Sequence, residues 1–285
     1  MQKIWVCGAR GQIGQAVNDV VDKLEFEMLD TDVDDLDVTD TDEVLRFGEM
    51  NRPDIIINCS GMTDISSCEE NPSQAFKVNA LGARNLAIVA AKMQAKMVQL
   101  STDDVFDGKS TEPYTEFDIT NPGTVYGKSK LAGENYVKEF TTKHFIVRST
   151  WVYGKGQNFI NGFLKKVDAG EQLSIASDQF GSPTSANELA RFLLHLVQTS
   201  EYGTYHATNK GVCSRYAFAQ EILKMTGKTA SMQPVPTVMS DFSKVRPAYA
   251  VLDNFIMSMV PIYDFPDWQD SLREYLEERG LYHAE

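Results

Sequence analysis

Short apolar runs alternate with amphipathic stretches over the first half of the chain. The run 55–59, Ile-Ile-Ile-Asn-Cys, lacks polar alternation, which is typical of a strand buried on both faces of a parallel sheet. Similar runs predict strands at residues 2–7, 26–30, 96–100 and 144–148. Helical spacing of apolar residues predicts helices at 13–23, 41–50, 72–94 and 126–140. This order predicts an α/β fold, a Rossmann-type doubly wound parallel sheet with helices on both faces.

The regular alternation weakens after about residue 150. Helical periodicity continues without regularly spaced strands at residues 155–170, 186–200, 214–227 and 267–279. We therefore expect a Rossmann domain over 1–150 and a smaller, mostly C-terminal α/β lobe over 151–285. A segment near 180–200 is expected to return to the main sheet.

Composition narrows the class of protein. A chain of 285 residues can bury a sizeable core, and its formal net charge of −13 disfavours nucleic acid or an anionic membrane as a partner. No apolar run approaches the length of a membrane span, and a strand begins at residue 2, which leaves no room for a signal peptide. We expect a cytoplasmic protein that binds neither nucleic acid nor membrane.

The cysteines argue against a structural metal or a disulfide framework. Four cysteines occur, at positions 7, 59, 68 and 213, and none has CxxC spacing. Histidine is also scarce, with four in the chain. We predict free thiols and no metal site.

A glycine-rich turn directly follows the first strand. Gly8, Gly11 and Gly14 match the pattern GxxGxxG at the start of a helix. Gly8 would permit the tight turn, Gly11 would let the backbone approach a pyrophosphate, and Gly14 would allow close helix packing. The free N–H groups of the helix N-terminus favour phosphate. The turn therefore predicts a dinucleotide-binding site.

Two residues give opposite indications about the dinucleotide. Asp30, at the end of the second predicted strand, lies where a carboxylate accepts from ribose hydroxyls and repels a 2′-phosphate. Arg10, within the glycine turn, could instead pair with a 2′-phosphate. The expected cofactor is NADH or NADPH, and Asp30 favours NADH.

A candidate catalytic group combines a hydroxyl with a YxxxK pair. Tyr126 and Lys130 are one helical turn apart, so both face the same side. An ammonium beside a phenol lowers the phenol pKa from about 10, which makes the phenol a better proton donor to a carbonyl that receives hydride. Thr102 follows the fourth strand, at the sheet edge where ligands bind.

The sequence resembles the dTDP-4-dehydrorhamnose reductase family of extended short-chain dehydrogenases over essentially its whole length. Its most specific stretches are 101–108 and 178–184. Further matching segments are 8–14, 36–40, 126–134, 148–154 and 246–254. The resemblance implies a substrate-binding C-terminal lobe and reduction of the C4 keto group of dTDP-4-dehydro-L-rhamnose.

The resemblance also implies residue roles. Tyr126 would protonate the developing alkoxide, Lys130 would hold the nicotinamide ribose, and Thr102 would donate to the same substrate oxygen. The residues implied to bind the cofactor, together with the glycine turn and the Tyr/Lys pair, are Gln12, Ile13, Asp37, Val38, Cys59, Ser60, Gly61 and Asn79. The residues implied to contact the substrate are Asp103, Asp104, Trp151 and Asn158.

Two departures from the family pattern concern the pocket. The family usually has tyrosine where this chain has Asp104, and a tyrosine is also replaced by Met62. A carboxylate near a diphosphate would repel it unless it is paired or faces the sugar hydroxyls. Carbonyl reduction with a nicotinamide is therefore better supported than the identity of the sugar.

Two other functions fit the same fold. An epimerase or dehydratase of sugar nucleotides would keep its NAD bound and show no net oxidation. A non-catalytic dinucleotide-binding regulator would not need Thr102, Tyr126 and Lys130, so their presence argues against it. The expected assembly is a monomer or a homodimer.

Overall fold

The fold is built on a six-stranded parallel sheet with the strand order β10-β5-β4-β3-β1-β2. The computed structural model describes residues 1–237 and 247–283, so Arg246 of the last matching segment lies outside them. The strands are β1 (Gln2–Cys7), β2 (Phe26–Thr31), β3 (Ile55–Asn58), β4 (Lys96–Thr102), β5 (His144–Ser149) and β10 (Gly203–His206). The carboxyl ends of the strands share one edge, where an open parallel sheet binds its ligands.

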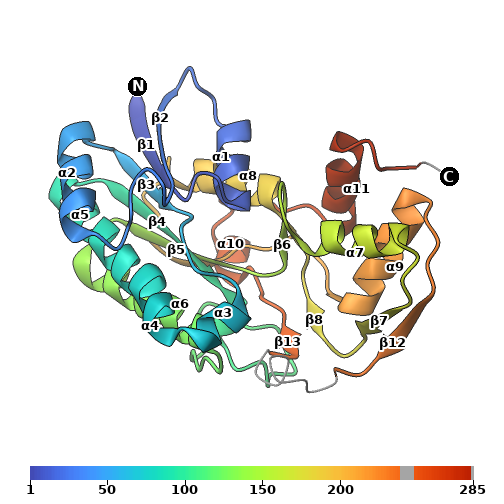
Figure 1. Cartoon of the computed structure of the whole chain (residues 1–285). Coiled ribbons are helices and arrows are strands. Elements are labelled where there is room, and N and C mark those ends of the chain that lie inside the picture. Colours follow the sequence, from blue (N-terminus) through green and yellow to red (C-terminus); the bar gives the residue numbers. More distant parts are fainter. Residues whose placement is uncertain (238–246, 284–285) are drawn as a thin grey trace.

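Helices cover both faces of this sheet (Figure 1). Alternate residues of β1 show the division, because Ile4 and Val6 pack toward one face while Trp5 and Cys7 pack toward the other. The first face is covered by α1 (Gln12–Val20) and α8 (Ala186–Leu196). The second is covered by α2 (Thr41–Asn51), α5 (Ala83–Met93) and α6 (Val125–Phe140).

A smaller lobe with its own core lies beside the carboxyl edge of the sheet (Figure 1). Its helices are α7 (Phe159–Asp168), α9 (Arg215–Thr226) and α11 (Trp268–Glu278). Three small sheets complete it: β7 (Leu173–Ala176) with β12 (Met232–Val235), β6 (Val152–Tyr153) with β9 (Thr184–Ser185), and β8 (Phe180–Gly181) between β11 (Cys213–Ser214) and β13 (Tyr249–Ala250).

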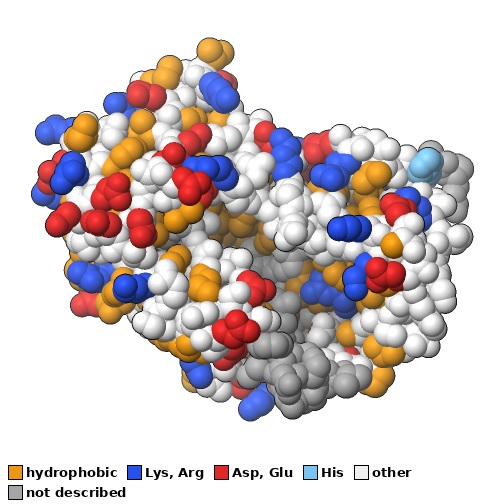
Figure 2. Space-filling model, in the orientation of Figure 1, with side chains coloured by type: hydrophobic (Ala, Val, Ile, Leu, Met, Phe, Trp, Pro, Cys, Tyr) orange, Lys and Arg blue, Asp and Glu red, His pale blue; other side chains and the backbone are white. Residues whose placement is uncertain are grey.

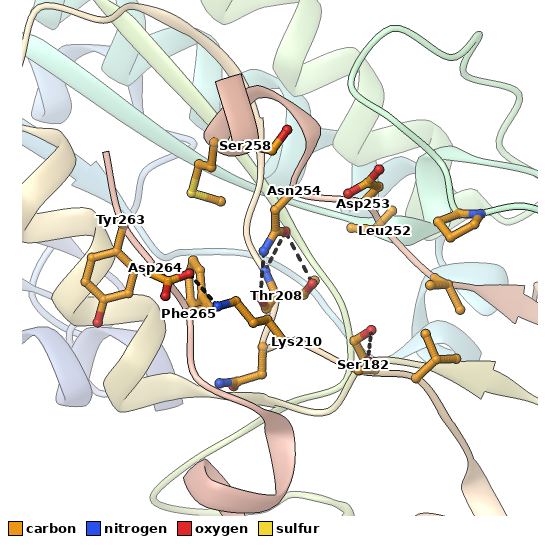
Figure 3. Close-up of a pocket in the computed structure, with 16 residues that line it drawn as sticks. Ser182, Thr208, Lys210, Leu252, Asp253, Asn254, Ser258, Tyr263, Asp264 and Phe265 are labelled. Atoms are coloured by element: carbon orange, nitrogen blue, oxygen red, sulfur yellow. Dashed lines mark hydrogen bonds and ion pairs between the residues drawn. The ribbon is translucent and has the colours of Figure 1, made fainter. Parts of the chain in front are cut away.

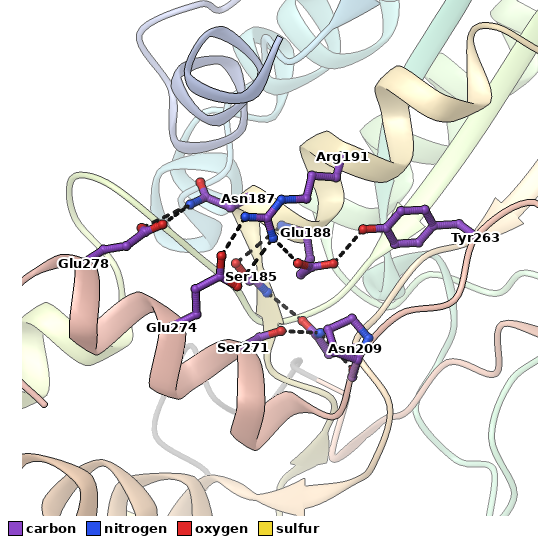
Figure 4. Close-up of polar contacts among 10 residues, drawn as sticks. Ser185, Asn187, Glu188, Arg191, Asn209, Tyr263, Ser271, Glu274 and Glu278 are labelled. Atoms are coloured by element: carbon purple, nitrogen blue, oxygen red, sulfur yellow. Dashed lines mark hydrogen bonds and ion pairs between the residues drawn. The ribbon is translucent and has the colours of Figure 1, made fainter. Parts of the chain in front are cut away.

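Polar contacts join the lobe to the main sheet through α8 (Figure 4). Arg191 of α8 pairs with Glu274 of α11 at 2.6 Å and with Glu188 one turn back on α8. Tyr263 donates a hydrogen bond to Glu188 at 2.7 Å. Since α8 packs on the sheet and α11 belongs to the lobe core, these contacts fix the two parts relative to each other.

The main sheet agrees with the sequence-based expectation, with two differences. All five predicted strands form, but a sixth, β10, adds to the edge beside β5 after the chain has passed through the smaller lobe. Its sequence, Gly-Thr-Tyr-His, lacks the apolar run that marks the other strands of the sheet.

The helix expected at 72–94 is not uniform. It begins as α4 (Pro72–Phe76), passes through a π-helical stretch (Lys77–Gly82), and continues as α5. The π-helical stretch buries the polar side chain of Asn79, which is 2% exposed. Within the described residues, no helix is both long and apolar enough to span a bilayer.

The close packing of α6 against the π-helical stretch generates a stability prediction. A Cβ on Gly133 would lie 2.4 Å from the Asn79 carbonyl oxygen, whereas a Cβ on Gly162 of α7 would meet nothing within 4 Å. Gly133→Ala should destabilise the protein by about 1–3 kcal/mol through overpacking, and Gly162→Ala should stabilise it by about 0.5–1 kcal/mol through helix propensity. Urea unfolding followed by circular dichroism measures both, and equal midpoints for the two variants would contradict the packing.

Candidate active site

Two adjoining cavities lie along the carboxyl edge of the sheet, and the second of them reaches into the hollow between this edge and the smaller lobe (Figure 2). The first, about 390 Å³, lies over the ends of β1, β2 and β3. The second, about 460 Å³, extends from β4 and β5 to the smaller lobe. They share the lining residues Gly11, Cys59, Ser60 and Gly61. An extended ligand could therefore occupy both.

The glycine turn takes the form that a dinucleotide diphosphate requires. Gly8 has a φ of 76°, and a Cβ there would lie 2.7 Å from the Ser60 nitrogen. A Cβ on Gly14 would lie 2.4 Å from the Gly8 oxygen. Gly11 is the N-cap of α1, and no side chain caps the helix, so its first N–H groups point toward the cavity end of the helix. These residues fit the diphosphate of a nicotinamide dinucleotide.

The acidic residues that line the nucleotide cavity are Asp32 and Asp37, and the expectation that Asp30 lies there is corrected. β2 continues to Thr31, and Asp30 is exposed and does not line the cavity. Thr31 and Asp32 do line it, and Thr31 is fixed by a hydrogen bond from the Trp5 indole N–H at 2.8 Å. Asp37 and Val38 line the same cavity.

Arg10 lies on the rim of the site, held by acids of the following loop. Its guanidinium pairs with Asp34 at 2.9 Å and with Asp35 at 2.6 Å, and its backbone N–H donates to Asp32 at 2.8 Å. The hydrogen bond and charge of Asp35 raise the Arg10 pKa, and the Arg10 side chain lowers the Asp35 pKa. The donors that could bind a 2′-phosphate are therefore engaged by carboxylates.

Asn79 supports the loop that closes the groove after β3. Its Oδ1 accepts from the Met62 N–H at 2.8 Å, and its Nδ2 donates to the Met62 carbonyl and to Ser129 Oγ, each at 2.9 Å. Met62 lines the nucleotide cavity and not the second cavity, whereas its replacement of a family tyrosine was expected to affect the substrate pocket. Cys59, in the shared part of the groove, has its thiol pKa raised to about 12 by burial.

The three candidate catalytic residues line the second cavity together. Tyr126 and Lys130 come from the first turns of α6, whose N-cap Thr124 accepts from the Gly127 N–H at 2.8 Å. Thr102 ends β4, and its hydroxyl donates to Asp103 at 2.9 Å. Burial lowers the Lys130 pKa to about 8. This lysine therefore still carries its charge at neutral pH.

Trp151 forms the wall of the second cavity opposite the sheet. Its φ of 47° is left-handed, which costs a non-glycine residue about 1–2 kcal/mol. The Arg215 guanidinium lies 3.5 Å from the ring centroid, and a Cβ on Gly181 would lie 2.6 Å from a ring atom. Both groups therefore restrict the space around the indole.

Arg215 is a site residue that the sequence did not reveal. It is the first residue of α9 and lines the cavity together with Phe159, over whose ring its guanidinium lies at 4.8 Å. The signal was an arginine directly after the N-cap Ser214 of a predicted helix. Such a residue acquires a role only when α9 packs beside Trp151.

Two residues expected to contact the substrate lie elsewhere. Asp104 is 2% exposed beneath α6, where a Cβ on Gly127 would lie 2.0 Å from its carbonyl oxygen, and it does not line the second cavity. Asn158 caps α7, where it accepts from the Asn161 N–H and donates to the Gly154 carbonyl. Asp103 remains at the cavity, where it also accepts from the Thr150 hydroxyl at 2.9 Å.

A separate cavity of about 360 Å³ lies between the loops that follow β10 and β13 (Figure 3). Its polar side chains have partners within the protein: Lys210 forms an ion pair with Asp264, and the Asn254 amide bonds to the backbone N–H and carbonyl and to the hydroxyl of Thr208. Among the described residues, no group of three His, Cys, Asp or Glu side chains could hold a metal ion.

The glycine turn and the Thr/Tyr/Lys group beside it define a nicotinamide-dependent oxidoreductase of the extended short-chain class. Comparison with known proteins gives the family. A family model described as the RmlD substrate binding domain matches residues 1–280. The spore coat polysaccharide biosynthesis protein SpsK of Bacillus subtilis is 35% identical, over 98% of this chain and 99% of its own length.

Two solved structures are similar over nearly the whole chain. A dTDP-4-dehydrorhamnose reductase from Clostridium acetobutylicum has a TM-score of 0.96 and 40% identity, covering 98% of this chain and all of its own. One from Bacillus anthracis, in complex with NADP, has a TM-score of 0.95 and 35% identity, with the same coverage. The chain therefore belongs to the RmlD substrate-binding domain family and is an NAD(P)-dependent reductase.

The loop contacts of Asn79 generate a prediction about cofactor affinity. Asn79→Ala removes the partners of both backbone groups of Met62, and should weaken NADH binding about tenfold, which corresponds to roughly 1.4 kcal/mol. Titration of the reduced-nicotinamide fluorescence measures it. Ser129→Ala is the control, since it removes one Asn79 contact and keeps both to Met62. Equal affinity in wild type and Asn79→Ala would refute this role.

Proposed function

We propose that the protein reduces the C4 keto group of a nucleotide-linked 6-deoxy sugar, converting dTDP-4-dehydro-L-rhamnose to dTDP-L-rhamnose with NADH or NADPH. The observation that carries the proposal is the convergence of Thr102, Tyr126 and Lys130 on one cavity that adjoins the glycine-turn cavity. The full-length similarity to proteins named as dTDP-4-dehydrorhamnose reductases supports the choice of sugar.

The protein's own residues would carry the proton chemistry. A bound reduced nicotinamide supplies the hydride. Tyr126 donates its phenolic proton to the oxygen of the carbonyl as negative charge develops there, and the Lys130 ammonium stabilises the phenolate left behind. Thr102 donates a hydrogen bond to the same oxygen, for which its hydroxyl must turn from Asp103 toward the substrate. Both donors thus act where charge appears in the transition state.

The second cavity offers suitable partners for the rest of the substrate. Aromatic side chains of the smaller lobe, among them Phe159 and Phe218, give apolar surface for a sugar or base. The Arg215 guanidinium places a positive charge in the same wall, which favours a diphosphate. Asp103, at the end of β4, can accept hydrogen bonds from sugar hydroxyls.

We further propose that NADH is preferred over NADPH. Asp32 lines the nucleotide cavity, where its charge would repel a 2′-phosphate, and Arg10 is paired with Asp34 and Asp35. The Bacillus anthracis relative was solved in complex with NADP. A preference of the present chain for NADH would therefore depend on its own acidic loop, which carries Asp32, Asp34 and Asp35.

The proposed reaction is tested by the absorbance of reduced nicotinamide. Purified protein is mixed with NADH or NADPH and dTDP-4-dehydrorhamnose, generated in situ by its upstream enzymes. Oxidation should occur with the wild type and fall at least 100-fold in Tyr126→Phe, because the proton donor is removed. Cofactor binding without oxidation would reject the sugar. Conversion of a sugar nucleotide without net oxidation would indicate an epimerase or dehydratase, and inactivity toward every keto sugar would indicate a regulator.

Release of Arg10 should improve the use of NADPH. In Asp34→Asn/Asp35→Asn, the guanidinium loses both carboxylates, so kcat/KM for NADPH should rise several-fold relative to NADH. Steady-state kinetics with the two cofactors measures the ratio. Asp42→Asn/Glu277→Gln is a control with the same change in net charge at exposed positions. An equal rise in both double variants would show a general charge effect and not release of Arg10.

A further inference from the structure

Glu134 is a fully buried carboxylate one helical turn beyond Lys130 on α6. Its Oε1 accepts hydrogen bonds from Ser101 Oγ at 2.6 Å and from Arg148 Nε at 2.9 Å. Its Oε2 accepts from Arg148 Nη2 at 2.7 Å. A single side chain thus joins α6 to β4 and β5.

The partners of Glu134 lie on the two strands that end at the second cavity, close to the candidate catalytic residue Thr102. Ser101 and Arg148 face each other across β4 and β5. Thr102 follows Ser101 in β4, so a contact that holds Ser101 also holds the strand end from which the Thr102 hydroxyl reaches the cavity. On α6, Lys130 lies on the same face as Glu134, four residues earlier. The carboxylate therefore fixes the distance between the two sides of the site.

Glu134 also contributes to the charge around Lys130. Burial lowers the Lys130 pKa, while the charge of Glu134 and then the thiol of Cys59 raise it. Cys59 faces the lysine from the end of β3, and Tyr126 precedes it by one turn on α6. Glu134 itself is faced by Arg148 of β5 and, from the solvent side, by Lys138, whose Nζ is 3.8 Å from Oε2.

We propose that Glu134 is a positioning residue for the reduction, which holds the α6 side chains Tyr126 and Lys130 against the end of β4. The inference rests on the proposed function for its kinetic readout. A purely structural ion pair would affect the stability of the fold alone, whereas removal of this negative charge is expected to lower the pKa of Lys130 as well.

The test compares Glu134→Gln with wild type in kcat and in the pH dependence of kcat/KM. The variant keeps the shape of the side chain and loses its charge. We expect kcat to fall about 10- to 100-fold because the site is less well positioned. The alkaline limb should move to lower pH, since a group that raises the Lys130 pKa is gone. Lys138→Met, which touches the same carboxylate from the surface, should change neither.

A second readout separates this inference from the proposed reaction. NADH affinity, measured by fluorescence across pH, depends on Lys130 without any sugar substrate. If wild type oxidises no NADH with the keto sugar, the proposed function fails, and a shifted binding limb in Glu134→Gln would still support the inference. If the alkaline limb shifts in neither the pH profile of kcat/KM nor that of NADH affinity, the expected effect of the Glu134 charge on Lys130 is overturned.

Ser101→Ala covers the case in which Glu134→Gln does not fold. It removes one hydrogen bond to the carboxylate and keeps the ion pair with Arg148. We expect a several-fold lower kcat with an unmoved alkaline limb, because position changes and charge does not. A wild-type kcat in this variant would overturn the positioning role.

Discussion

The site depends on the close approach of α6 to the backbone of two other segments. Gly127 allows the helix to lie against the Asp104 carbonyl, and Gly133 allows it to lie against the Asn79 carbonyl. These contacts leave no room for a side chain at either point. Because the helix is fixed in its first turn and at its middle, Tyr126 and Lys130 are held at the carboxyl edge of the sheet beside the loop that Asn79 supports.

Charge is distributed differently at the ligand site than over the molecule. The chain carries a formal net charge of −13, yet the residues suited to anions are backbone N–H groups at the start of α1 and the guanidinium of Arg215. Backbone dipoles and one cation can bind phosphate without a basic surface. The guanidinium of Arg10, by contrast, is paired with the acids Asp34 and Asp35 of the following loop.

The two-part architecture explains why the site is assembled from distant segments. The sheet contributes the glycine turn and the ends of β4 and β5, whereas the smaller lobe contributes Trp151 and Arg215. α8 packs on the sheet directly after β9, and its ion pair with α11 links the two cores (Figure 4). The cavity wall therefore has a fixed position relative to the candidate proton donor.

The sequence by itself determined the local patterns: five strands of the parallel sheet, the glycine turn, and a tyrosine and lysine one turn apart on a helix. These follow from spacing within a few residues, where backbone geometry decides which side chains share a face. Tertiary structure alone decided which side chains reach the cavities. It placed Asp32 and not Asp30 at the nucleotide cavity, and it placed Asp104 under α6. It also made Asn158 a helix cap and brought Arg215 beside Trp151. Each of these depends on contacts between segments far apart in the chain, which no local spacing encodes.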